Sequence, residues 1–102
     1  MKNKVNSEEE KLMQTKESLI NTLYARKKTE NDYLDTVENL LNYWKSKLNT
    51  VDNPKRRDDI LNMISTEEST INKIKEDITR INELIDQTEN NLNKISKVFS
   101  SL

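Results

Sequence analysis

The sequence predicts an all-α protein, an antiparallel hairpin of two long helices that resembles a short coiled coil. The 102 residues include no glycine and a single proline near the midpoint. Tight β-turns and phosphate-binding loops depend on glycine, so its absence argues against sheets and nucleotide-binding folds. On both sides of the proline, apolar residues return every three or four positions, the spacing of a helix that buries one narrow stripe against another helix.

The first predicted helix spans about residues 7–49. Ser7 and Glu10 have the spacing of a capping box, and the acidic first turn suits the positive end of the helix dipole. Residues 1–6 are therefore expected to be a disordered N-terminus. The predicted inward residues of this helix are Leu12, Leu19 (with Met13 and Ile20 beside them), Leu23, Tyr33, Leu34, Val37, Leu40, Leu41, Trp44 and Leu48.

The inward stripe of the first helix fails between Leu23 and Tyr33, where Arg26 and Glu30 occupy seam positions. Two interpretations are open. The long side chains of a solvated stretch can lie along the seam with their charged ends in water. Alternatively, a buried polar layer fixes the pairing of the helices at a cost in stability.

The turn is predicted at about residues 50–53, in the segment Thr50-Val51-Asp52-Asn53-Pro54. Proline disfavours helical geometry in the preceding residue and suits the first helical position, so Asn53 is the expected N-cap. The second helix is predicted over about residues 54–100. Ser65-Thr66-Glu67-Glu68 could cap a new helix, but the apolar frame continues across it, so we expect one continuous helix.

The second helix carries the more regular stripe, interrupted only at Glu67 and Thr88. Its members are Ile60, Ile64, Ile71, Ile74, Ile78, Ile81, Ile85, Leu92, Ile95, Phe99 and Leu102. Further apolar residues flank the seams at Met13, Ile20, Leu34, Leu41, Leu61, Met63, Leu84 and Val98. Each helix thus carries a stripe wider than two strands require, which predicts that the hairpin completes a three- or four-helix bundle with a partner.

The residue types available argue against catalysis. Without cysteine or histidine the chain has no thiol or imidazole nucleophile, no base poised near neutral pH and no structural zinc site. No catalytic, metal-binding or cofactor-binding residue is predicted, and no cofactor or small-molecule partner is expected. The net charge of −1 gives no general attraction to nucleic acid, and no apolar run is long enough for membrane insertion.

Basic residues nevertheless gather around the turn, at Lys45, Lys47, Lys55, Arg56 and Arg57. They could contact phosphate or an acidic partner. The simpler interpretation is that the cations before the turn favour the helix dipole and those after it are solvated. A base-stacking platform requires glycine or exposed aromatic residues among the cations, and none is expected here.

Trp44, the only tryptophan, lies about one turn before the end of the first helix. It can close the core beside the turn or anchor a partner, because aromatic residues dominate binding hot spots. The predicted protein-interface residues are Leu34, Val37, Leu41, Trp44, Ile71, Ile78 and Ile85.

A helical hairpin of about a hundred residues, without cysteine or a cleavable signal peptide and with Trp44 just before its midpoint, resembles the WXG-type proteins of Gram-positive type VII secretion. It is most similar to the accessory proteins that accompany LXG toxins. The resemblance implies a targeting factor or chaperone that packs on the helical N-terminal domain of the toxin, on a second small hairpin, or on both. It also implies a cytoplasmic protein, or one co-exported without a cleavable signal peptide.

The sequence departs from this family in two places. Trp44-Lys45-Ser46 lacks the glycine of Trp-x-Gly, and Phe99 is not followed four residues later by an acid, as in the family's export signal. The resemblance therefore implies that another subunit supplies the signal. The alternative is a hairpin that pairs with itself, a structural or inhibitory coiled-coil protein of phage or mobile-element origin.

Overall fold

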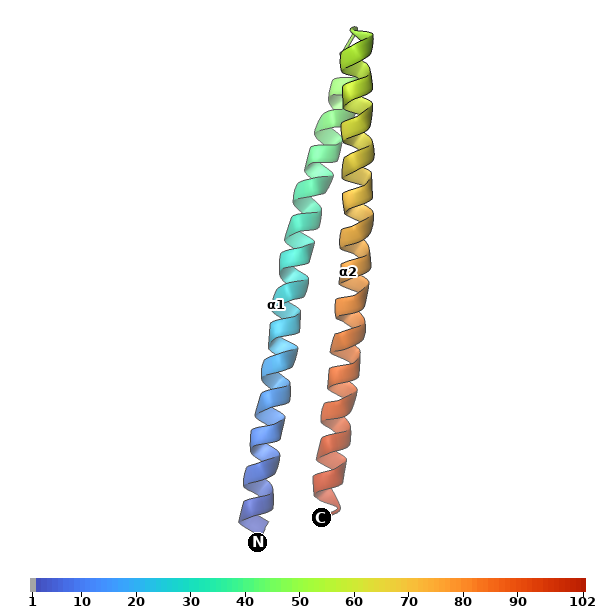
Figure 1. Ribbon diagram of the computed structural model, residues 1–102. Helices are drawn as coiled ribbons and strands as arrows, with labels where there is room; N and C mark the ends of the chain where they lie inside the picture. The colour runs from blue at the N-terminus through green and yellow to red at the C-terminus, as the bar shows by residue number, and fades with distance from the viewer. Residues whose placement is uncertain (1) are drawn as a thin grey trace. The chain divides into compact units, whose positions relative to one another are not determined.

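In the computed structural model, two long helices are joined by a short turn (Figure 1). The structure describes residues 2–102, with side chains from Ser7 onward. Helix α1 spans Lys2–Leu48 and helix α2 spans Pro54–Ser100, and the range 2–102 contains no strand. The predicted all-α helical hairpin is confirmed.

The start of α1 differs from the prediction. The helix begins at Lys2, inside the segment expected to be disordered; Met1 lies outside the described residues. Ser7 and Glu10 therefore lie within the helix, and Ser7 is not its N-cap. The physical reason is that residues 2–6 contain neither proline nor glycine, and extending an existing helix by one residue costs far less than nucleating a new one.

The turn closes without any residue in the left-handed region, since no described residue has a positive φ. The exposed carbonyls at the end of α1 find other donors. The Thr50 N–H and hydroxyl donate to the Lys47 carbonyl at 3.0 and 3.1 Å, and Arg57 Nη1 donates to the Leu48 carbonyl at 3.4 Å. These bonds satisfy groups that a helix C-terminus leaves unpaired, a task more often given to a glycine cap.

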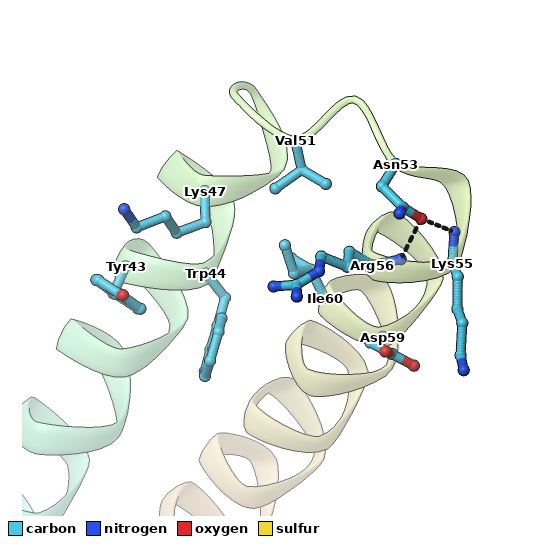
Figure 2. Close-up of a pocket in the computed structure, with 9 residues that line it drawn as sticks. All are labelled: Tyr43, Trp44, Lys47, Val51, Asn53, Lys55, Arg56, Asp59 and Ile60. Atoms are coloured by element: carbon cyan, nitrogen blue, oxygen red, sulfur yellow. Dashed lines mark hydrogen bonds between the residues drawn. The ribbon is translucent and has the colours of Figure 1, made fainter.

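Asn53 caps α2 as its sequence position predicts. Its side-chain oxygen accepts hydrogen bonds from the backbone N–H groups of Lys55 at 3.0 Å and Arg56 at 3.4 Å (Figure 2). Pro54 follows as the first helical residue, where its missing N–H costs nothing.

We expect Asn53→Ala to lower the free energy of unfolding by about 1 kcal/mol, because the first N–H groups of α2 lose their acceptor. Urea denaturation followed by far-UV circular dichroism measures the change. Asn72→Ala, at an exposed position inside α2, is the control and should not destabilise the protein. Equal losses from both variants would contradict the role of Asn53.

The chain packs as two compact units. The first combines the residues up to Lys28 with Arg80–Leu102, and the second is Thr29–Thr79. In the first unit Leu23 packs with Ile81 and Ile85; in the second, Val37 packs with Ile71 and Ile74. Each unit therefore has its own small core, made of one stretch of α1 and one stretch of α2.

The seam of α2 agrees with the heptad prediction almost throughout. Its isoleucines at 60, 64, 71, 74, 81 and 85 are buried, and the helix continues without a break through Ser65 and Glu68. Thr88 is buried as well, and its hydroxyl donates to the Leu84 carbonyl at 2.7 Å, so the polar interruption is satisfied within the helix. Leu102 is the exception: it lies beyond the end of α2 and is exposed.

Candidate protein-interaction surface

The predicted interface residues are used mainly by the hairpin itself. Val37 and Ile71 are buried in the second unit, with Leu34, Leu41 and Ile78 packed against them as half-buried neighbours. Ile85 is buried in the core of the first unit. Trp44 belongs to neither cluster and is half-buried near the turn. Of the seven residues, Trp44 alone lines a hollow beside the turn.

The inward face of α1 is narrower than the predicted one. The expected seam residues that do face inward are Leu23, Leu34, Val37, Leu41, Trp44 and Leu48, together with Met13 and Ile20. Leu12, Leu19, Tyr33 and Leu40 were also expected in the seam but are exposed, so the face is turned toward the second residue of each apolar pair. Arg26 is likewise exposed, and Lys27 is half-buried in its place, with Glu30 half-buried as expected. The reason is that adjacent apolar residues offer two stripes of equal spacing, and packing on α2 selects one of them.

Large apolar side chains lie on the outside of both helices. Leu61, Met63, Leu84 and Val98 of α2 flank the seam as predicted, whereas Leu12, Leu19, Tyr33 and Leu40 of α1 are outside because their neighbours are turned inward. The exposed large apolar residues are Leu12, Leu19, Tyr24, Tyr33, Leu40, Tyr43, Leu61, Met63, Leu84, Val98 and Leu102. No described side chain from Ser7 onward is less than 2% exposed. The cores are therefore thin, and much apolar area stays in water.

A hollow of about 560 Å³ lies beside the turn, within the second unit (Figure 2). We call it the Trp44 hollow; it is lined by Tyr43, Trp44, Lys47, Val51, Asn53, Lys55, Arg56, Asp59 and Ile60. The Trp44 ring lies on the side of α1 that faces α2, and Arg56 extends from α2 toward it (Figure 2). The lining of the hollow is mixed: Trp44, Val51 and Ile60 are apolar, and Arg56 reaches toward them, whereas Lys47 and Lys55 extend away from the hollow (Figure 2).

Near the turn, two aromatic rings contact each other, and a lysine lies over one of them. The rings of Tyr43 and Trp44 meet edge to face, with centroids 5.1 Å apart and planes inclined by 72°. Lys47 Nζ lies 5.6 Å from the centroid of the Tyr43 ring, within the range of a cation–π contact. Because Tyr43 is 50% exposed, the expectation that no exposed aromatic residue lies among these cations is wrong.

Across the first unit, Tyr24 of α1 joins α2 through a polar contact. Its hydroxyl donates to Glu89 Oε1 at 3.1 Å. The hydrogen bond to the Glu89 carboxylate, followed by the negative charge of that group, raises the pKa of Tyr24 above its ordinary value. The Tyr24 hydroxyl therefore lies beside the negative charge of Glu89.

The described residues contain no group of three or more His, Cys, Asp or Glu side chains arranged to hold a metal ion. Neither described helix has a stretch apolar enough to cross a membrane. In comparisons with protein-family models, curated proteins and solved structures, nothing matched this chain.

Proposed function

We propose that this chain is a non-enzymatic protein-binding module that packs on a helical client. The observation that carries the proposal is the balance between its thin cores and its outward apolar residues. Side chains such as Leu19, Leu40 and Leu84 are close to half-exposed, although each lies beside a seam residue. Apolar area of this kind is costly in water and is commonly covered in a complex.

The client we propose is the helical domain of a type VII-secreted LXG-type toxin, with this chain as its targeting factor or chaperone. Support comes from the resemblance to the WXG-type accessory proteins and from the position of Trp44 at the rim of a hollow beside the turn. A second small hairpin could complete the same bundle.

Affinity capture tests this proposal. The tagged chain is expressed in its native host, captured proteins are identified by mass spectrometry, and the client is then co-expressed with the chain for a binding titration. The expected client has a helical domain and forms a complex of defined stoichiometry. A chain that captures only itself, and sediments as a stable dimer, would instead support the alternative of a self-assembling coiled-coil hairpin.

We expect Trp44→Ala to weaken the client complex by about 2 kcal/mol or more, because an aromatic side chain at a hollow has the character of a hot spot. Stability should fall by less than the roughly 3–5 kcal/mol typical of a fully buried tryptophan, since Trp44 is only half-buried. Tyr24→Ala, which truncates an exposed aromatic residue of the same helix, is the control. Unchanged binding of the Trp44 variant would remove this residue from the interface.

A further inference from the structure

The two sides of the first unit differ in chemistry, and the seam residues show which side chains belong to each. Successive residues of an α-helix point about 100° apart, so the residues just before seam residues lie on one side and those just after lie on the other. In an antiparallel pair, the residues just before the seam residues lie on the same side of the pair in both helices, and the residues just after them lie on the other side. Two observations agree with this geometry.

The first observation is a groove of about 400 Å³, lined in part by residues that come just before seam residues in both helices. Leu12, just before Met13, lines it together with Asn91 and Val98, which come just before Leu92 and Phe99. The second observation is the hydrogen bond between Tyr24 and Glu89, which follow Leu23 and Thr88. The groove and the hydrogen bond thus mark opposite sides of the unit.

The groove side is apolar, and we call it the leucine face. Its apolar members are Leu12, Leu19, Leu84 and Val98, with exposed fractions of 39%, 44%, 45% and 57%. The leucines of α1 are seven residues apart and the two apolar residues of α2 are fourteen apart, so both lines follow the heptad repeat. The groove lies at the Leu12 and Val98 end of these lines, and Leu19 and Leu84 extend the lines beyond it. Two such lines of exposed apolar side chains match the surface that a third helix covers in a bundle.

The leucine face also carries positive charge. Lys94 lines the groove and Arg26 lies on the same side, against Glu8 alone among the acids that precede seam residues. Lys16 lines the groove from the seam itself, in the heptad column that also holds Glu9. The opposite side of the unit carries Glu10, Glu17, Asp86 and Glu89 against Lys28. The raised pKa of Tyr24 agrees with a negative environment there. The apolar surface therefore coincides with the cations, and the acids lie away from it.

We propose that the leucine face binds an acidic amphipathic helix of another protein. Apolar side chains of that helix enter the groove between Leu12 and Val98, and its flanking Asp or Glu residues lie beside Lys16 and Lys94. A second copy of this chain is a poor occupant, because two leucine faces meeting across a two-fold axis bring the same cations together. The proposal deepens the proposed function, on which it rests, by giving the docking face and the charge of the client helix.

A display library of helical peptides tests the proposal directly. Each peptide keeps a leucine and isoleucine seam over four heptads, while the flanking positions vary among Glu, Gln and Lys. Selection on the immobilised full chain should enrich Glu over Lys at those positions by about tenfold or more. Survivors rich in Lys, survivors without charge preference, or no survivors would each overturn the proposal.

Two variants of α2 locate the binding face. Leu84→Gln removes an apolar contact from the leucine face and should weaken the selected peptides about tenfold. Leu61→Gln is the matched control, because Leu61 is 43% exposed but belongs to the second unit and is no part of the leucine face. Lys94→Glu should abolish the preference for acidic peptides while leaving the apolar side chains in place. Circular dichroism verifies that all three exposed substitutions leave the helices formed.

Two further measurements separate this proposal from other occupants and from the proposed function. If the chain binds vesicles of phosphatidylglycerol and phosphatidylcholine, and Leu84→Gln abolishes that binding, the leucine face binds a lipid surface and the proposal is overturned. If the chain forms a dimer that Leu84→Gln dissociates, the occupant is a second copy and the proposal is likewise overturned. A client captured in the host and bound equally by the Leu84 and Leu61 variants would overturn the docking face alone, leaving the proposed function standing.

Discussion

Ile74→Asp is expected to lower the free energy of unfolding by at least about 3 kcal/mol, enough to unfold much of the second unit. Ile74 is 3% exposed and packs with Val37 and Ile71. A carboxylate there must lose its water or force the helices apart, and no described cation is buried at this site to pair with it. Urea denaturation followed by circular dichroism measures the loss.

Two controls separate charge from position. Asn72→Asp adds the same charge at an exposed site two residues away and should change stability by only about 0.5 kcal/mol. Ile74→Asn places a neutral group of similar shape in the core. Because burial raises the pKa of a carboxyl group, the extra penalty of Asp over Asn should be largest at neutral pH and shrink on acidification. A penalty independent of pH would contradict burial of the charge.

Leu23→Ala is expected to cost about 2–3 kcal/mol of stability, near the lower end for a buried leucine because a two-helix core can partly collapse or admit water. Leu23 is 5% exposed and packs with Ile81 and Ile85 in the first unit. Leu19→Ala makes the same substitution one helical turn earlier, where the side chain is 44% exposed, and should cost about 0.5 kcal/mol.

The pair of leucine variants also tests the rotation of α1. Both positions fit an apolar repeat in the sequence, and only the fold makes one inward and the other outward. Similar losses from Leu19→Ala and Leu23→Ala would mean that α1 buries a different stripe from the one described. Thermal melts of both variants, recorded at the same protein concentration, make the comparison.

The seam of α2 could be predicted because its isoleucines have few apolar neighbours. Around Ile71, Ile74 and Ile78 the adjacent residues are polar, so only one stripe at heptad spacing exists. The burial of those positions then follows from periodicity alone. The proline and its N-cap were equally clear, because a residue without a backbone N–H suits few helical positions other than the first.

The seam of α1 was ambiguous because apolar residues come in adjacent pairs, such as Leu19-Ile20, Tyr33-Leu34 and Leu40-Leu41. One column of the heptad, which includes Leu23, Val37 and Trp44, is common to both possible stripes. The other column runs through either the first or the second member of each pair. The last position of that column distinguishes the two possible stripes. The stripe through the first members of the pairs ends at the charged Lys47, whereas the stripe through the second members ends at the apolar Leu48. That signal was present in the sequence and points to the stripe that the structure buries.

The proposed contact surface was harder to predict, because it depends on which stripe the fold leaves outside. Once α1 turns Ile20 inward, Leu19 joins Leu84 among the exposed apolar residues. The groove near Leu12 and Val98 then needs both helices in register. Periodicity along one helix contains no information about how two sets of side chains come together across a pair.

The paired apolar residues of α1 have a consequence for how such a chain can diverge. Ile20 and Leu34 maintain the fold, whereas Leu19 and Tyr33, one residue earlier, face outward. Under the proposed function, substitutions in the outer column can therefore change which partner is recognised while every intermediate sequence still folds. Among descendants of this chain, the inner column should then diverge slowly and the outer column quickly, so that new clients are acquired on an unchanged scaffold.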